Sequence, residues 1–238
     1  MKIYITGTSS GIGKALAELL LENNFEVVGL SRRQTLNHPN YIHITIDLSD
    51  LKQLKAFNFP ANYKDDVVLV NNAGKVGPIK PVGQQITKEI VSLNCLNVIA
   101  PQVLMNKFIC QYKGNSTPNY QIINISSGAG KRPIDAWAAY CASKAAIDLF
   151  SETVAEELAA RNHTNWKIYS IAPGVVDTEM QKEIRASSPK NFLSHQKFID
   201  LKINNELNSV SVVAEKLKCI IEADNADLPV KFSLHDVS

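Results

Sequence analysis

The amino-acid sequence predicts an α/β fold: a doubly wound parallel sheet of about seven strands with helices on both of its faces. Short apolar runs rich in β-branched residues recur along the 238 residues, and helical patterns lie between most of them. These runs are continuously apolar rather than alternating, as a parallel sheet covered on both faces requires. Alternation of strand and helix indicates crossover connections between parallel strands. The expected strands are 3–6, 26–30, 41–46, 67–70, 121–125, 167–171 and 230–233, and the expected helices are 12–23, 87–113, 137–161 and 210–223.

Two segments depart from this alternation. Only residues 34–40 separate the second and third strands, fewer than the roughly 12 that a helical crossover takes, so a loop or a single turn is expected there. Residues 179–201 are polar and contain Ser187-Ser188-Pro189, which predicts a substrate loop. Since no linker, repeat or shift in composition interrupts the chain, we expect residues 1–238 to form a single domain.

Composition excludes several classes of function. The chain is 45% hydrophobic and 20% charged, with a net charge of +2 and no basic run longer than Arg32-Arg33, so we expect no nucleic-acid partner. No apolar run approaches the roughly 20 residues that cross a bilayer, which argues against a membrane protein. The first residues, Lys2-Ile3-Tyr4-Ile5, do not resemble a signal peptide, and a cytoplasmic location is expected.

The four cysteines suggest neither a metal site nor a disulfide framework. Cys95, Cys110, Cys141 and Cys219 show no close pairing and no nearby pair of histidines. We therefore expect no metal and four free thiols, most of them buried, as free cysteines usually are.

A glycine-rich segment follows the first expected strand. Thr6-Gly7-Thr8-Ser9-Ser10-Gly11-Ile12-Gly13 leads directly into a helical pattern. Glycines permit a tight turn and let the backbone approach a pyrophosphate, whose charge is favoured at a helix N-terminus. The segment therefore predicts a Rossmann-type dinucleotide site, with a purely structural turn as the alternative.

The end of the second strand indicates which dinucleotide binds. Ser31 occupies the position of the usual ribose-binding carboxylate and is followed by Arg32 and Arg33. A guanidinium can pair with a 2′-phosphate that a carboxylate would repel, so NADP is favoured over NAD. Alternatively, both arginines only face solvent. After the third strand, Asp47-Leu48 is expected near the adenine, unless Asp47 simply caps a helix.

Tyr140 and Lys144 lie four residues apart on one face of the helix 137–161, and Ser127 follows the strand 121–125. Ligands bind at the carboxyl ends of strands in open parallel sheets. A phenol with a pKa near 10 is a weak acid at neutral pH, and lowering that pKa by about three units takes roughly 4 kcal/mol. A cation within about 4 to 6 Å, here Lys144 together with the positive ring of an oxidised nicotinamide, is a suitable perturber. Tyr140 is then a candidate general acid, and Ser127 a hydrogen-bond donor to a substrate oxygen.

Together these residues resemble the short-chain dehydrogenase/reductase family across nearly the whole chain. TGTSSGIG at 6–13 is similar to its cofactor loop, Asn71-Asn72-Ala73-Gly74 to its NNAG motif, and Ser127 with Tyr140-Cys-Ala-Ser-Lys144 to its catalytic motif. Pro173-Gly174-Val175-Val176-Asp177-Thr178 is similar to the motif after its sixth strand.

The resemblance implies further roles. Asn94 matches a catalytic asparagine whose main-chain carbonyl holds a water linked to the lysine, although it could be a surface amide. Lys144 would also bind the nicotinamide ribose, and Thr178 could instead be a plain N-cap. The cofactor residues that the motifs imply are Gly7, Ser9, Ser10, Gly11, Ile12, Gly13, Ser31, Arg32, Asp47, Leu48, Asn71, Ala73, Gly74, Tyr140, Lys144, Pro173, Gly174, Val176 and Thr178.

Two departures from the family pattern concern the cofactor loop and the C-terminus. Ser10 stands where NADP-preferring members often have a basic residue, so Arg32 carries the argument for NADP. The short polar C-terminus and Ser31-Arg32 resemble the sepiapterin reductase and benzil reductase branch, in which a late aspartate can meet the substrate. A solvated tail is the preferred interpretation for Asp236 and His235.

The sequence thus predicts an NADP-dependent oxidoreductase that reduces a ketone or diketone, with Asn94, Ser127, Tyr140 and Lys144 catalytic. The alternatives are an NAD-dependent secondary alcohol dehydrogenase and a non-catalytic, NADP-binding regulatory protein. The resemblance also implies a homodimer or homotetramer. The expected substrate of the protein is a small carbonyl compound.

Overall fold

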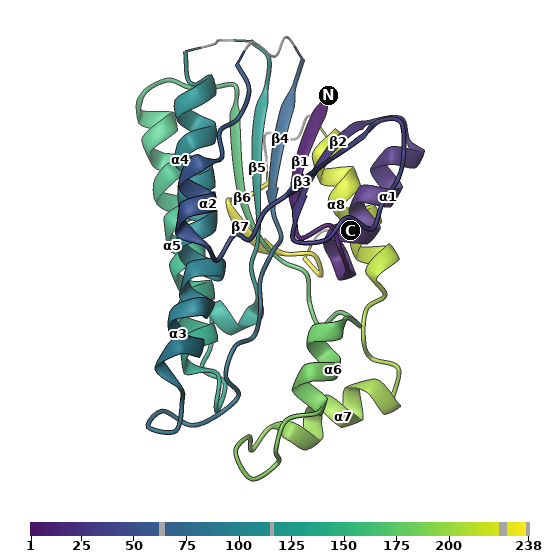
Figure 1. The fold of residues 1–238 in the computed structure, drawn as a ribbon, viewed down its shortest axis with the longest axis vertical. Coiled ribbons are helices and arrows are strands. Elements are labelled where there is room, and N and C mark those ends of the chain that lie inside the picture. The colour runs from purple at the N-terminus through teal and green to yellow at the C-terminus, as the bar shows by residue number, and fades with distance from the viewer. Residues whose placement is uncertain (62–64, 115–116, 224–227, 237–238) are drawn as a thin grey trace.

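A parallel sheet organises the computed structural model, which describes residues 1–61, 65–114, 117–223 and 228–236. Its seven strands have the order β3-β2-β1-β4-β5-β6-β7, and every neighbouring pair is parallel. The predicted fold class is confirmed (Figure 1). The strands are β1 (Lys2–Thr6), β2 (Glu26–Ser31), β3 (Tyr41–Thr45), β4 (Val67–Asn71), β5 (Tyr120–Ile125), β6 (Trp166–Ala172) and β7 (Lys231–Ser233).

Helices cover both faces of this sheet (Figure 1). On one face, α1 (Gly11–Glu22) and α8 (Val210–Glu222) pack on each other and on the sheet, burying Ile3, Ile5 and Leu217. On the other face lie α2 (Leu51–Ala56), α4 (Ala100–Tyr112) and α5 (Ala138–Ala160), which bury Tyr4 and Phe108. Apolar layers on both sides explain why the strands read as continuously hydrophobic runs.

The helix expected over 87–113 is interrupted. It consists of α3 (Thr87–Asn94), a π-helical segment at Cys95–Ile99 and α4. Pro101 lies in the first turn of α4. A proline has no N–H and its ring collides with the carbonyl four residues earlier, here that of Asn97. Widening the helix into a π-turn is a common way to accommodate such a residue.

The connection from β2 to β3 contains no helix, as predicted from its length. The prediction of a loop at 179–201 was wrong about its secondary structure. The segment contains α6 (Glu179–Arg185) and most of α7 (His195–Ile203). Each helix is shorter than three turns, too short for a clear apolar period. Their stability comes from packing: Ile184, Phe192 and Phe198 are buried against Trp137 of the segment before α5.

The expectation of mostly buried cysteines was also wrong. Cys110 and Cys219 are exposed, and Cys95 and Cys141 are only half-buried. All four lie in helical segments that have a solvent-facing side, so they fill surface positions rather than core positions. Among the described residues, no helix is long and apolar enough to span a bilayer.

Candidate active site

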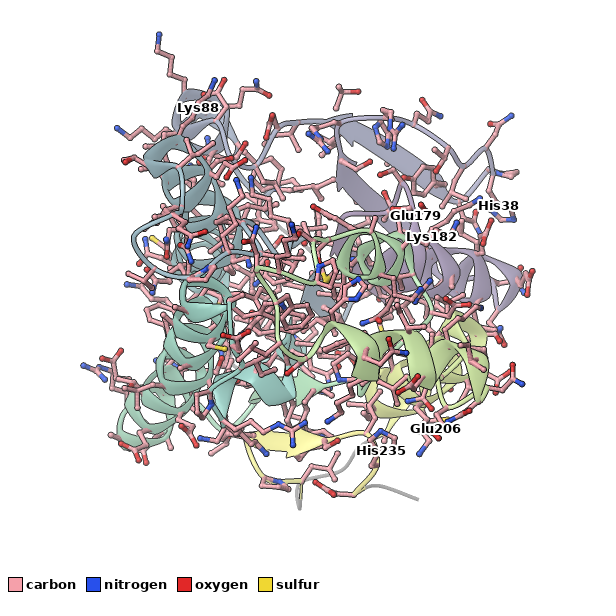
Figure 2. The ribbon with its side chains drawn as sticks, turned by 90° about the horizontal axis from the view of Figure 1, so that it is seen from below. His38, Lys88, Glu179, Lys182, Glu206 and His235 are labelled. Carbon is pink, nitrogen blue, oxygen red and sulfur yellow. The ribbon has the colours of Figure 1, made fainter. Side chains whose placement is uncertain are left out.

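A cavity of about 730 Å³ lies at the carboxyl ends of the strands. Strands β2 and β3 lie on one side of β1, and the chain then crosses to β4 on its other side. Such a switch point in the strand order is where ligands bind in open α/β sheets. The first helical turn of α1, the start of α5 and most of α6 contribute to its lining. Viewed from this edge, α6 with the labelled Glu179 and Lys182 lies in front of the sheet (Figure 2).

The glycine loop forms one end of the cavity. Gly7 and Gly11 have positive φ angles of +77° and +58°, which glycine adopts without steric cost. Gly13 does not line the cavity but lies beneath it, where a Cβ would approach Asn72 Nδ2 to 2.3 Å and Gly7 O to 2.6 Å. Asn72 Nδ2 donates to Thr6 O at 2.9 Å. This close packing holds the loop against β4.

The N-terminus of α1 faces this cavity. Its N-cap, Ser10, makes no side-chain capping hydrogen bond, and the first turn contains no acidic residue. The first N–H groups of a helix have no intrahelical partner and favour an anion. This loop and helix end therefore fit the pyrophosphate of a dinucleotide.

The cavity continues on the opposite side of the glycine loop. Ser31, Arg32, Asp47 and Leu48 all line the cavity, as predicted, and Arg32 is exposed. Asp47 does not cap α2, because Asp50 is the N-cap. Hydrogen bonds from Ser49 to the Asp47 carboxylate lower its pKa, and the nearby Arg32 charge adds to this effect.

The NNAG motif is divided between two roles. Asn72, Ala73 and Gly74 line the cavity. Asn71, predicted to do the same, is buried below it and donates from Nδ2 to Asn124 Oδ1 at 2.8 Å. As the last residue of β4, it points into the sheet's packing rather than its edge. The sequence motif did not distinguish these two asparagines.

Three of the four expected catalytic residues line the cavity. Ser127, Tyr140 and Lys144 line it together, and Tyr140 and Lys144 are 6% and 7% exposed. The Lys144 Nζ lies 5.7 Å from the Tyr140 ring centroid and donates to Ile125 O at 2.7 Å. Ser127 is held at the start of a 3-10 turn, where its Oγ accepts from Ala129 N–H at 3.2 Å.

Burial dominates the acid–base properties of this group. It raises the pKa of Tyr140 to about 12, although a hydrogen bond with the Ser127 side chain opposes the increase. It lowers the pKa of Lys144 to about 8, and the negative charge of Asp148 opposes that decrease. Lys144 alone therefore does not give Tyr140 the lowered pKa expected from the sequence. A further positive charge beside the phenol, such as that of an oxidised nicotinamide ring, would lower the pKa of Tyr140.

The structure does not bring Asn94 into the cavity. Its side chain donates to Ile90 O at 2.9 Å, within its own helix. Asn97, three residues later, is 3% exposed. Its Nδ2 donates to Lys75 O at 2.8 Å and to Ser143 Oγ at 3.2 Å, and its Oδ1 accepts from Lys75 N–H at 3.0 Å.

The main chain at Asn97 departs from a regular α-helix. Its carbonyl would normally accept from the residue four positions later, which is Pro101 and has no N–H. It lies within the π-helical segment that packs against α5. Sequence reasoning chose Asn94 from its place in the motif. The Asn–Pro spacing of four residues is the sequence signal that draws attention to Asn97.

Aromatic side chains form the end of the site opposite the cofactor loop. Trp137 and Phe198 line the cavity, and Phe192 supports them from behind. The Trp137 ring stacks on Phe192 at 5.6 Å, packs on Phe198 at 5.2 Å and meets Tyr140 edge-on at 5.5 Å. No sequence motif pointed to this aromatic wall, because its members are far apart in the chain.

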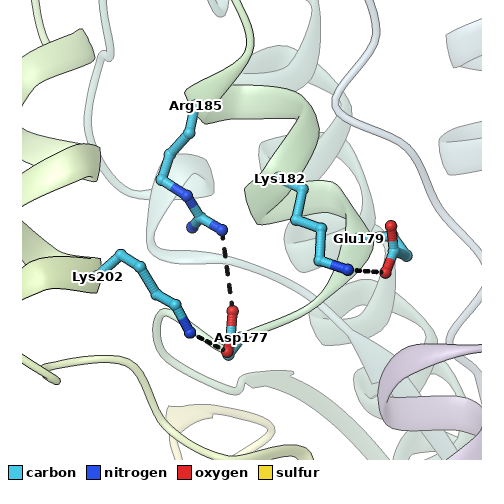
Figure 3. A network of polar contacts seen from close by, with 5 residues as sticks. All are labelled: Asp177, Glu179, Lys182, Arg185 and Lys202. Carbon is cyan, nitrogen blue, oxygen red and sulfur yellow. Dashed lines mark hydrogen bonds and ion pairs between the residues drawn. The ribbon is translucent and has the colours of Figure 1, made fainter.

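Ion pairs connect α6 and α7 to the loop that follows β6 (Figure 3). The Asp177 carboxylate accepts from Lys202 of α7 at 2.7 Å and lies 4.0 Å from Arg185 of α6. Lys182 pairs with Glu179 at 2.6 Å within α6. Thr178 is the N-cap of α6 and lines the cavity, but it makes no side-chain capping hydrogen bond.

The remaining predicted residues at this end are placed as follows. Pro173, Gly174 and Val176 line the cavity. So does His235, which was expected in a solvated tail: its Nε2 lies 2.4 Å from the place of a Cβ at Gly174. His235 is labelled beside β7 in Figure 2. Asp236 does not line the cavity, and its carboxylate accepts from Ser233 N–H at 3.2 Å.

Comparisons with known proteins agree with this arrangement. Residues 1–189 match the family model described as short chain dehydrogenase. A benzil reductase ((S)-benzoin forming) from Bacillus cereus is 36% identical, with 93% of this chain and 94% of the relative covered. A sepiapterin reductase from Xenopus tropicalis is 25% identical, with 92% and 90% covered.

A solved structure extends the comparison to the fold. The crystal structure of a short-chain dehydrogenase/reductase from Saccharomyces cerevisiae matches with a TM-score of 0.83 at 25% identity, and the match covers 99% of this chain and 96% of that chain. Family model, relatives and fold all agree with the motifs gathered at the sheet's edge. The chain therefore belongs to the short-chain dehydrogenase/reductase family of NAD- or NADP-binding oxidoreductases.

Proposed function

We propose that the protein is an NADP-dependent reductase that converts a ketone or diketone into a secondary alcohol. The observation that carries this proposal is the convergence of buried Tyr140 and Lys144 with Ser127 on one cavity floor, next to a loop that fits a dinucleotide. The cofactor would supply the hydride. The residues of this chain orient the carbonyl, exclude water and deliver a proton to its oxygen.

In this mechanism Tyr140 donates the proton to the developing alkoxide. Ser127 donates a hydrogen bond to the same oxygen, where negative charge accumulates. Lys144 stabilises the phenolate that remains, since a cation near a phenol favours its ionised form. Both lysine and tyrosine are shielded from solvent, so their interaction is weakly screened.

We assign to Asn97 the role that the family resemblance had implied for Asn94. The carbonyl of Asn97 lacks its usual helical donor, so it can accept a hydrogen bond from a water. Its side chain is fixed by Lys75 and Ser143, the latter one residue before Lys144. Through such a water the lysine can exchange protons with solvent.

The aromatic wall supports a substrate with an aryl or similarly flat apolar group. Trp137, Phe198, Ile184 and Met180 line the cavity beyond Tyr140. Apolar and aromatic linings favour apolar ligands, with a few polar groups fixing their orientation. Relatives named benzil reductase also point to a diketone that carries aromatic rings. An aryl 1,2-diketone is therefore the first substrate to test.

Turnover in Tyr140→Phe tests the proposal. The wild type should oxidise NADPH in the presence of an aryl diketone. Tyr140→Phe should lower kcat at least about 1000-fold, within the range general acids contribute, while NADPH binding stays within a few-fold. The substitution removes only the hydroxyl and keeps the ring packed on Trp137. Substantial turnover in Tyr140→Phe, or wild-type activity confined to NAD and alcohols, would contradict the proposal.

We also propose a homo-oligomer that assembles through the outer faces of α4 and α5. Leu149 of α5 is 67% exposed and Ile99, just before α4, is 37% exposed. Exposed apolar side chains of this kind are common at interfaces between subunits. A monomer in sedimentation equilibrium at micromolar concentration would refute the assembly, and Leu149→Lys should dissociate it.

A further inference from the structure

Asp148 lies one helical turn after Lys144 on α5 and is buried, with 4% of its surface exposed. Residues four apart on a helix are neighbours on one face. The Asp148 Oδ1 accepts from Ser170 Oγ of β6 at 2.6 Å, and Ser170 is itself fully buried. Nothing in the reaction scheme above uses this carboxylate. A buried charge is costly unless it is compensated, so its presence beside the active-site lysine calls for a reason.

The same turn that carries Ser127 covers Asp148 and Lys144. Gly130 packs so closely on α5 that a Cβ there would lie 2.7 Å from Asp148 Oδ2 and 3.0 Å from the main-chain carbon of Lys144. A side chain at position 130 would push this turn away from the helix. Because both side chains are buried, solvent screens the interaction between their charges only weakly.

The pKa of Lys144 depends on the negative charge of Asp148. The Lys144 Nζ donates to a neutral carbonyl, Ile125 O, and burial brings its pKa down to about 8 against the opposing effect of Asp148. Without the carboxylate, the lysine would lose its proton nearer to neutral pH. The proposed mechanism requires it charged, because a neutral amine does not favour the phenolate of Tyr140.

We propose that Asp148 is a positioning residue of this active site, whose buried carboxylate keeps Lys144 protonated at neutral pH. The inference rests on the proposed function, in which Lys144 acts as a cation. Asp148 touches neither substrate nor cofactor and acts only through the lysine. This role would explain why position 148 has a carboxylate, although a neutral side chain could accept the same hydrogen bond from Ser170.

Other charged and titratable groups surround this pair. Lys231 of β7 faces Asp148 and pairs with Glu152 of α5 at 2.8 Å. Glu152 is one turn beyond Asp148, at a partly exposed position, and its charge is already paired. Titratable groups on elements packed against α5 include Lys167 and Tyr169 on β6, Lys231 on β7, Lys88 and Glu89 on α3, and Cys95 in the π-helical segment, besides Tyr140, Cys141 and Glu152 on α5 itself and Lys75 in the loop after β4. Asp148 is the buried acid among them.

Asp148→Asn tests the charge while keeping the hydrogen bond from Ser170. In protein labelled with ¹³C-lysine, the Lys144 Cε resonance, assigned by its loss in Lys144→Ala, should titrate near pH 8 in the wild type. In Asp148→Asn it should titrate about one pH unit lower, as expected for loss of a neighbouring opposite charge. The alkaline limb of the pH profile of kcat/KM should move in the same direction. The NADPH dissociation constant at pH 6.5 should stay within about three-fold.

Two variants separate charge from packing. Glu152→Gln removes a carboxylate from the same helix, and Ser170→Ala removes the hydrogen bond but not the charge; both should leave the Lys144 titration in place. Should Asp148→Asn not fold, the smaller and equally neutral Asp148→Ser gives the same test. An unchanged Lys144 titration in a folded neutral variant overturns the inference. The NMR titration needs no substrate, so it stands apart from a failure to find turnover.

Discussion

The two ends of the active-site cavity are built in different ways. At the cofactor end, backbone conformation and glycine packing fix the geometry: Gly7 and Gly11 have positive φ, and Gly13 packs against Asn72. At the substrate end, side chains from distant segments do this work, with Trp137 held between Phe192 and Phe198. One end therefore depends on the absence of side chains, and the other on their presence.

Recognition of a pyrophosphate is general among such sites, whereas recognition of a substrate is particular to each protein. A pyrophosphate is recognised by main-chain N–H groups at a helix end, which any sequence with the right glycines can offer. A substrate is recognised by the shape of an apolar wall, which many combinations of side chains can form. The ion pairs of Asp177 with Lys202 and Arg185 then hold that wall over the sheet (Figure 3).

The largest effect is expected at the cofactor end, from Gly13→Ala. The added methyl would meet Asn72 Nδ2 at 2.3 Å and Gly7 O at 2.6 Å, so the loop must move. Overpacking costs about 1–3 kcal/mol, which corresponds to roughly 5- to 150-fold in affinity. We expect NADPH binding, measured by fluorescence, to weaken about 100-fold. Gly114→Ala, where a Cβ meets nothing within 4 Å, is the control. Unchanged binding in Gly13→Ala would show that the loop is not rigid.

The cofactor end is easier to predict from the sequence than the substrate end, because its geometry depends on local motifs. Gly7, Gly11, Ser127, Tyr140 and Lys144 all line the cavity, as the local motifs predicted, whereas Gly13 lies beneath it. The asparagines were harder. Asn71 and Asn72 are neighbours in the motif, but only Asn72 lines the cavity. The role implied for Asn94 is one that we propose for Asn97, which lies in a π-helical segment that the sequence did not predict.

Tertiary packing decides what the sequence could not show. The wall of Trp137, Phe192 and Phe198 joins residues up to 61 positions apart (198 − 137). Short helices such as α6 carry little periodic signal of their own. His235 is exposed, as expected, but it also lines the cavity, where Gly174 leaves room for its ring. Asp148 belongs to this group too, since only the fold reveals that it is buried beside Lys144.

A smaller effect, confined to the substrate end, is expected from Phe192→Ala. Phe192 is fully buried and stacks on Trp137 without lining the cavity itself. Its removal should let Trp137 shift and raise KM for an aryl diketone about 30-fold, since an aromatic pair contributes about 0.5–1.5 kcal/mol beyond area burial and a cavity adds to this. NADPH affinity should not change. Leu193→Ala, at an adjacent and 85% exposed side chain, is the control. Equal losses of cofactor and substrate binding would contradict independent ends.

The smallest effect is expected from Arg32→Ala, which tests whether a side chain also matters at the cofactor end. Arg32 lines the cavity next to Ser31 but is exposed, so solvent weakens its pairing with a 2′-phosphate. A charge-assisted hydrogen bond of about 1.5 kcal/mol corresponds to roughly 10-fold in affinity. We expect NADPH to bind about 10-fold more weakly in Arg32→Ala while NADH binding stays unchanged. Arg33→Ala, also exposed but outside the cavity lining, should affect neither cofactor. Equal weakening of both cofactors by Arg32→Ala would mean that the arginine supports the loop rather than reading the phosphate. The cofactor end would then depend on its backbone alone, and the preference for NADP would need another source.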